Sequence, residues 1–244
     1  MQALIEYLTR ILPGMLLIVL TFILLKPGPY LRIVYYVFIF VFLRIALTPL
    51  GLWQLGETHG LLWIRLSSNP VFLILFGLSS LIITTGLWLF DRENRNTLIW
   101  MRGKALPGLI SGTAGCALVV LPFISLYPGI PLAERGGAVG SELLLPLLVF
   151  ALLGNLFEET LFRGYVLGFL SKTRNLTVAG IVSGVVFALC HSFLATTVTD
   201  IGIPLLLFTL WEGVIAGLVG ARHGILPAAL THGGAIFMLS SGLI

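Results

Sequence analysis

The chain has 244 residues, of which 58% are hydrophobic and 10% are charged, and its mean hydropathy is +1.07. Soluble domains carry about 25% charged residues, so this composition excludes a water-soluble protein. The formal net charge is +4, but the basic residues lie between apolar runs, so we interpret them as determinants of membrane orientation and expect no nucleic-acid partner.

The apolar runs are about 20 residues long, which suits membrane-spanning helices and not the shorter alternating strands of a membrane barrel. Because backbone amides in lipid must be paired within the chain, we predict an all-α fold, a polytopic helical bundle in one integral-membrane domain over residues 1–244. About eight transmembrane helices are expected, near residues 4–25, 31–47, 71–90, 106–127, 142–172, 177–194, 201–221 and 226–244. We interpret the first as a retained helix, because no basic segment and no small-residue cleavage site frame it.

One loop and the two cysteines add to this outline. Residues 48–70 mix aromatic and charged side chains, which indicates a segment at the membrane interface. Cys116 and Cys190 both lie in predicted spans, so we expect no disulfide framework, and the redox compartment stays open.

Lysine and arginine gather in alternate loops. The loops after the first, third, fifth and seventh spans hold nine of them: Lys26, Arg32, Arg92, Arg95, Arg102, Lys104, Lys172, Arg174 and Arg222. The other loops hold only Arg65 and Arg135, and Arg10 lies near the N-terminus. Since basic loops tend to stay in the cytoplasm, we predict a multi-pass protein of the cell membrane with both termini outside.

The fifth span carries two adjacent carboxylates and a guanidinium, in the stretch Gly154-Asn-Leu-Phe-Glu-Glu-Thr-Leu-Phe-Arg-Gly164. An ionised side chain at the bilayer centre costs roughly 2.5 to 3.5 kcal/mol on insertion scales, so such residues indicate function. Glu159 and Arg163 are four residues apart with the acid first, and we predict that they form an ion pair. Glu158 is rotated by about 100° from Glu159 about the helix axis and has no partner in its own helix. Its carboxylate is therefore available for chemistry.

Residues from three predicted spans reach a similar depth in the membrane. Glu158 lies fourteen residues before Lys172, and His191 lies fourteen residues into the sixth span, so each is roughly 21 Å from the cytoplasmic end of its helix. His232 lies ten residues past Arg222, or roughly 15 Å in. A neutral imidazole can relay a proton or ligate a metal, whereas an isolated buried histidine is as often a packing residue. The shared depth favours a catalytic group of Glu158, His191 and His232.

Glu212 is the other acid inside a predicted span. It is either a proton relay or substrate-binding group, or a protonated or paired glutamate that braces the bundle against Arg44, and we favour the brace. The sequence contains no Gly-rich phosphate loop, no CxxC pair and no HExxH motif.

The intramembrane polar residues form a known combination of motifs. The patterns EExxxR and FxxxH and the start of HxxxN follow one another as Glu158-Glu159-Thr-Leu-Phe-Arg163, Phe187-Ala-Leu-Cys-His191 and His232. In these residues the chain resembles the CAAX prenyl protease and bacteriocin-processing family of intramembrane proteases, also called the Abi family. The resemblance covers residues 144–244, the family-like catalytic core, and the first four helices are supported by hydropathy alone.

The resemblance implies hydrolysis of a peptide bond within or beside the membrane. Glu158 would then be the general base that activates water, and His191 would orient or polarise that water. Glu159 and Arg163 would hold the helix geometry, and Phe187 would support the second motif.

The third motif departs from the family pattern. In the family, His232 and an Asn four residues later would stabilise the oxyanion of the tetrahedral intermediate, but this chain has Ile236, which has no donor. Losing one oxyanion donor costs about 2.7 to 4 kcal/mol, so the departure weighs against efficient catalysis. Asn155, three residues before Glu158 and on nearly the same helix face, is the expected substitute.

The family has been described both as metalloproteases and as metal-independent glutamate proteases. Glu158, His191 and His232 could supply three zinc ligands and leave a fourth position for water. No two of them share a helix as in HExxH, so we favour Glu-activated water with no cofactor. The expected partners are the lipid bilayer and a membrane-associated peptide or protein, reached through a site that opens toward the cytoplasm.

Two other functions stay open. A catalytically weakened or non-enzymatic membrane protein of the same fold, in bacteriocin self-immunity or as a scaffold, is favoured by Ile236. A proton-coupled carrier would use Glu212, Glu158 and His191, but no inverted repeat of broken helices supports it. Prenylated CAAX chains, leader peptides, quorum peptides and bacteriocins all fit as substrates of the protease.

Overall fold

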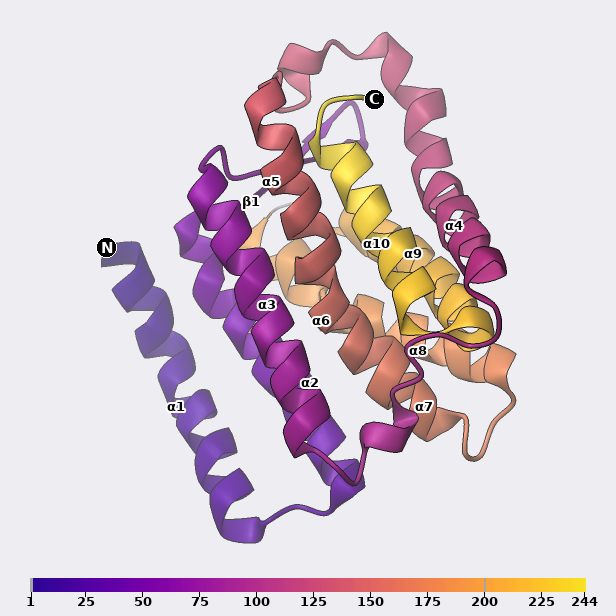
Figure 1. Cartoon of the computed structure of the whole chain (residues 1–244). Helices are drawn as coiled ribbons and strands as arrows, with labels where there is room; N and C mark the ends of the chain where they lie inside the picture. The colour runs from indigo at the N-terminus through magenta and orange to yellow at the C-terminus, as the bar shows by residue number, and fades with distance from the viewer. Residues whose placement is uncertain (1, 200) are drawn as a thin grey trace.

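A computed structural model of the chain describes residues 2–199 and 201–244 (Figure 1). Its helices are α1 (Gln2–Leu25), α2 (Pro29–Leu47), α3 (Pro70–Phe90), α4 (Ala105–Leu126), α5 (Leu144–Val149), α6 (Asn155–Glu159), α7 (Leu167–Leu170), α8 (Leu176–Cys190), α9 (Ile203–His223) and α10 (Ile225–Ser240). The helices α5, α6 and α7 form one continuous helical segment, so the predicted bundle of about eight helices is confirmed.

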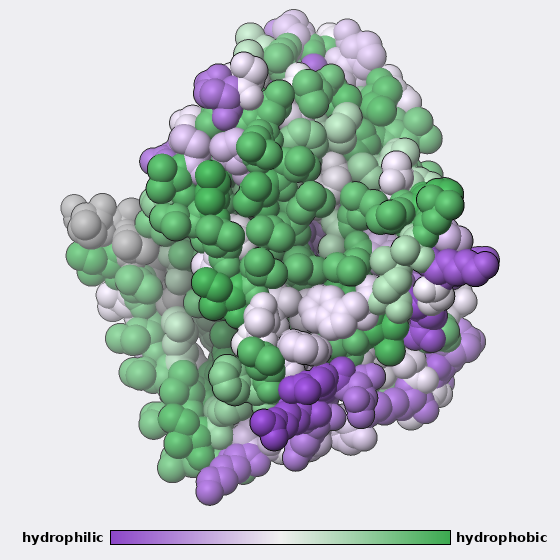
Figure 2. Space-filling model, viewed as in Figure 1, coloured by the Kyte–Doolittle hydropathy of each residue, from purple (hydrophilic) through white to green (hydrophobic). Residues whose placement is uncertain are grey.

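Within the described ranges, six helices are long and apolar enough to cross a membrane, and α10 and residues 12–25 of α1 form shorter apolar helices. Figure 2 shows hydrophobic residues over the middle of the visible face, with hydrophilic residues gathered mainly at its lower end. In Figure 1 both termini lie toward the upper end of the bundle, opposite the basic loops that follow α3 and α7. The chain is therefore a multi-pass membrane protein.

The segment that contains the carboxylate pair is not a regular α-helix. Wide π-helical turns at Phe150–Gly154 and Thr160–Val166 flank the α-helical turn Asn155–Glu159. Such turns are rare and are often found at functional sites. They place Glu158 and Glu159 on a short regular stretch between two irregular ones.

The predicted interfacial segment 48–70 contains a β-hairpin, which the sequence reasoning missed. Strands β1 (Trp53–Thr58) and β2 (Leu61–Leu66) pair antiparallel, and the two turn residues, His59 and Gly60, have φ of 53° and 79°. Positive φ at both positions matches the twist that a two-residue hairpin requires. A helix-length hydropathy window averages over strands of six residues, so it does not detect this element.

Two side chains fix β2 to the helices. Arg65 is 5% exposed; its Nη1 donates to the Leu239 carbonyl oxygen at 3.0 Å and its Nε donates to the Gly137 carbonyl oxygen at 3.1 Å. The Tyr127 hydroxyl donates to the Leu62 carbonyl oxygen at 2.6 Å. The hairpin is therefore held against α10 and the end of α4.

Glycines bring α8 and α9 into backbone contact. A Cβ atom at Gly184 would lie 2.6 Å from the backbone of Gly213, and one at Gly217 would lie 2.2 Å from the carbonyl oxygen of Gly180. Small residues at a helix interface permit this close approach. The contact places the part of α8 that carries Phe187 beside the stretch of α9 that carries Glu212.

Candidate active site

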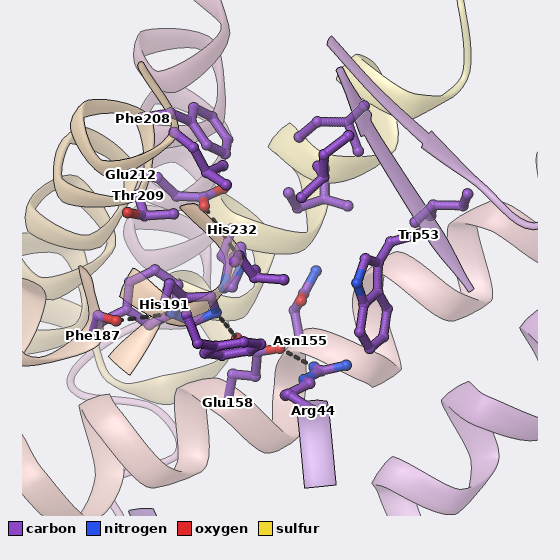
Figure 3. A pocket seen from close by; sticks show the side chains of 17 residues that line it. Arg44, Trp53, Asn155, Glu158, Phe187, His191, Phe208, Thr209, Glu212 and His232 are labelled. Atoms are coloured by element: carbon purple, nitrogen blue, oxygen red, sulfur yellow. Dashed lines mark hydrogen bonds and ion pairs between the residues drawn. The ribbon is translucent and has the colours of Figure 1, made fainter. Parts of the chain in front are cut away.

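A cavity of about 100 Å³ lies beneath the hairpin, where α2, α6, α8, α9 and α10 meet (Figure 3). It is large enough for several water molecules. Its polar lining consists of Arg44, Asn155, Glu158, His191, Thr209, Glu212 and His232, and its apolar lining includes Trp53, Leu55, Ile64, Leu66, Phe187, Phe208 and Ile236. The three side chains predicted to form the catalytic group thus lie around one cavity.

Glu158 is 4% exposed, and its two carboxylate oxygens have different neighbours. Its Oε1 accepts a hydrogen bond from Nη2 of Arg44, a residue of α2. Its Oε2 makes no hydrogen bond to the described part of the chain and lies 3.4 Å from Nε2 of His191. The carboxylate is held by one oxygen, and the other lies beside His191 without a hydrogen-bond partner in the described residues.

Arg44 was assigned to the wrong acid by the sequence reasoning. We expected it as the partner of Glu212, whereas it pairs with Glu158. Its guanidinium carbon lies 5.3, 5.4 and 5.1 Å from the ring centroids of Phe40, Trp53 and Phe76. An arginine inside an apolar span signals a buried partner. Nothing in the linear sequence decides which of three buried acids that partner is.

His191 caps the C-terminal end of α8, which ends at Cys190, before the predicted Leu194. Its Nδ1 lies 2.8 Å from the Phe187 carbonyl oxygen. A carbonyl oxygen only accepts, so Nδ1 carries the proton and, in the neutral ring, Nε2 has a lone pair. That lone pair faces Oε2 of Glu158, which leaves two acceptors side by side at the cavity.

The predicted ion pair of Glu159 and Arg163 is confirmed, with 2.8 Å between Oε1 and Nη1. Nη2 of Arg163 also donates to the Gly213 carbonyl oxygen at 2.7 Å, which ties this pair to α9. Nδ1 of His232 lies 2.9 Å from the same Oε1 of Glu159. The brace therefore fixes the position of the imidazole of His232 as well as the helix geometry.

Phe187 lies between the two histidines. Its ring centroid is 4.3 Å from that of His191 and 5.3 Å from that of His232, and the guanidinium carbon of Arg163 lies 4.7 Å from it. At 1% exposure the ring is part of the core. It fixes the orientation of both imidazoles by packing.

Three further residues complete the lining beside these groups. Nδ2 of Asn155 donates to the Ala151 carbonyl oxygen at 2.7 Å. Ile236, at the position of the family's Asn, adds only hydrocarbon to the wall. Oε2 of Glu212 lies 3.6 Å from Nε2 of His232, so Glu212 faces a histidine and not Arg44.

In the described residues, the three candidate zinc ligands do not form a metal-binding group. Zinc needs an imidazole nitrogen directed at the ion. The two ring nitrogens of His232 instead face Glu159 and Glu212, at 2.9 and 3.6 Å. Among residues 2–199 and 201–244, no group of three His, Cys, Asp or Glu side chains is arranged to hold a metal ion.

Comparison with known proteins gives one match. Residues 140–238 match the family model of the type II CAAX prenyl endopeptidases, described as Rce1-like. No curated protein and no solved structure matches the chain. The matched range runs from just before α5 into α10 and includes Glu158, His191 and His232, whereas Arg44 and the hairpin lie outside it. Residues 140–238 therefore form an Rce1-like segment, and the resemblance predicted from the sequence is confirmed over this range.

Proposed function

We propose that the protein is an intramembrane endopeptidase that hydrolyses a peptide bond in a membrane-associated peptide or protein. The Rce1-like match supports a CAAX-protease-like enzyme. One observation carries the finer proposal: Oε2 of Glu158 has no hydrogen-bond partner in the described residues, lines a cavity, and lies 3.4 Å from Nε2 of His191. Two adjacent acceptors in a cavity are suited to hold the two hydrogens of one water molecule.

The reaction uses that water as the nucleophile. The water oxygen forms a bond to the carbonyl carbon while Glu158 takes one of its protons, and the π electrons of the carbonyl move to its oxygen. When the C–N bond breaks, the nitrogen takes the proton from Glu158 and the C=O bond forms again. A positioned general base contributes about 10² to 10⁴ in rate.

Arg44 and the surrounding protein support this role of Glu158. The guanidinium holds Oε1, so that Oε2 is the oxygen left to accept a proton. Because the cavity wall is largely apolar, the electrostatic interaction of the two Glu158 oxygens with nearby charges is stronger than it would be in water. His232, held by Glu159, lies on another part of the cavity wall.

We propose that the reaction needs no metal ion. The support is the arrangement: in the described residues Glu158, His191 and His232 do not form a metal-binding group. Glu158 and one water molecule account for every proton that is transferred in the reaction.

The orientation of the site stays a proposal. The hairpin lines the cavity and lies toward the same end of the bundle as the termini, opposite the basic loops (Figure 1). By the distribution of Lys and Arg that end is outside, so this position does not support the predicted opening toward the cytoplasm. Labelling with a membrane-impermeant maleimide in intact cells decides between the two. Glu57→Cys would react if the hairpin is outside, and Lys172→Cys would react if it is cytoplasmic.

Cleavage by the purified protein in liposomes tests the proposed function. The probes are a farnesylated, internally quenched CAAX peptide and a library of membrane peptides. We expect wild type to cleave, Glu158→Gln to lose about 10² to 10⁴ in rate, and Glu142→Gln, an exposed acid at the start of the same helical segment, to cleave like wild type. Full activity of a folded Glu158→Gln variant contradicts the proposal.

A non-enzymatic protein of the same fold is the second candidate, and Ile236 is the observation that favours it. The side chain lines the cavity where the family's Asn would donate to an oxyanion. On this alternative, the wild-type protein cleaves neither the CAAX probe nor any library peptide.

A further inference from the structure

We propose that Glu212, which belongs to none of the family-like motifs, donates the hydrogen bond to the oxyanion that Ile236 cannot donate. This inference rests on the proposed function and adds a catalytic residue to it. Glu212 is 1% exposed, lies on α9, and lines the cavity together with His232 and Ile236.

The hydrogen bonds of His232 determine which of its ring nitrogens faces Glu212 and whether that nitrogen carries a proton. Oε1 of Glu159 accepts from Nη1 of Arg163 at 2.8 Å and lies 2.9 Å from Nδ1 of His232. A carboxylate paired with a guanidinium accepts, so Nδ1 of His232 carries a proton. Nε2 then points at Oε2 of Glu212 across 3.6 Å. At 3.6 Å this contact is longer than a hydrogen bond, so it does not hold a proton between the two atoms.

Charge balance favours a proton on Glu212 itself. Arg44 pairs with Glu158 and Arg163 pairs with Glu159. In the described part of the chain, neither a lysine nor an arginine pairs with Glu212, and its one ionisable partner, His232, lies 3.6 Å away and is hydrogen-bonded to Glu159. A carboxylate removed from water without a cation is costly, and it avoids the cost by taking up a proton. Glu212 is therefore a hydrogen-bond donor.

Glu212 lines the cavity and has one buried oxygen without a hydrogen-bond partner in the described residues. Oε1 of Glu212 has no hydrogen-bond partner in the described residues, so the carboxyl group can turn its O–H away from His232. Other donors are partly engaged: the Thr209 hydroxyl donates to the Leu206 carbonyl oxygen at 3.1 Å, and one N–H of Asn155 donates to Ala151. The unpartnered indole N–H of Trp53 belongs to β1, away from His232 in Figure 3, so the donor beside His232 is Glu212.

The positions of these side chains suit a substrate carbonyl that lies between Glu158 and His191 on one side and Glu212 on the other. In Figure 3, Glu212 and His232 lie above Glu158 and Arg44, with His191 at the left of the cavity. Water held by Glu158 and His191 approaches the carbonyl carbon from one side, and the O–H of Glu212 donates to the carbonyl oxygen from another. As the C–O bond to water forms, the carbonyl oxygen becomes negative and the hydrogen bond strengthens. Glu212 keeps its proton when the C=O bond forms again.

Two substitutions at one position separate donation from other roles. Glu212→Gln keeps an N–H donor, and Glu212→Leu removes it at similar volume. With the farnesylated CAAX probe, we expect Glu212→Leu to lower kcat by about 10² to 10³ with little change in KM, and Glu212→Gln to stay within about tenfold of wild type. Adding Ile236→Asn to Glu212→Leu supplies a donor from α10, and we expect it to restore kcat by at least about tenfold.

Each contrary result has a distinct meaning. A Glu212→Leu variant as active as wild type overturns the inference, and so does a Glu212→Gln variant as inactive as Glu212→Leu, since an ionised carboxylate would then be required. Thermal unfolding shows whether each variant is folded, and Glu212→Met replaces the leucine variant if that one fails. If wild type cleaves and Glu158→Gln does not, a negative result at Glu212 concerns this inference alone; if wild type cleaves no peptide, the proposed function fails.

Discussion

Removing the guanidinium of Arg44 isolates a buried carboxylate, and the cost can be worked out from the structure. The side chains of Arg44 and Glu158 are 12% and 5% exposed. Breaking a buried ion pair by deleting one partner costs about 3 to 5 kcal/mol, because the remaining charge loses its compensation. We expect Arg44→Met to lower the free energy of unfolding by that amount, measured by titrating mixed micelles with SDS and following helical circular dichroism.

A second substitution tests whether the cost comes from the uncompensated charge. Replacing a buried pair by apolar groups of similar volume is often neutral, so the double variant Arg44→Met, Glu158→Met should recover most of the stability. Arg222→Met, an exposed arginine at the end of α9, should change the unfolding free energy by about 0.5 kcal/mol or less. If Arg44→Met were as stable as this control, or the double variant were less stable than Arg44→Met, the reasoning would be refuted.

Three further predictions concern the cavity wall and the cofactor. Phe187→Ala removes a ring that is 1% exposed and contacts His191 and His232; we expect a loss of about 3 to 5 kcal/mol in the same unfolding titration, and a loss below about 1 kcal/mol would contradict its packing role. Trp53→Phe removes a buried indole N–H that has no partner in the described residues, and keeps a ring beside Arg44; we expect unchanged kcat and a KM raised by about two- to tenfold, whereas an unchanged KM would exclude a substrate hydrogen bond. Prolonged chelation should leave the cleavage rate unchanged, and a loss that zinc restores would show a metal-dependent reaction.

Much of the fold was predictable because membrane helices follow from hydropathy. The count of apolar runs gave the helical bundle, and the i, i+4 spacing of Glu159 and Arg163 gave their ion pair. The depth estimate also placed Glu158 and His191 in one layer, and their side chains lie 3.4 Å apart. These features depend on spacing along one helix or on distance from a helix end.

Two of the three features that were missed depend on contacts between distant parts of the chain. Arg44 and Glu158 are 114 residues apart, and the sequence does not rank Glu158 above Glu212 as the partner. The hairpin was not predicted because its strands are short and lie next to apolar helices in the sequence, so their pattern of alternating burial is difficult to detect. The contact between His232 and Glu159 likewise requires the packing of α10 against α6.

The central claim is that Glu158 and His191 act on the same water molecule, and a double-variant kinetic cycle tests it most directly. Single-turnover cleavage of the CAAX probe is measured for Glu158→Gln, for His191→Ala and for both substitutions together. Residues that act as one unit are strongly non-additive, so we predict that the double variant is about as slow as the slower single variant. Losses that multiply, with all three variants folded, would show that the two side chains act independently and would contradict the account.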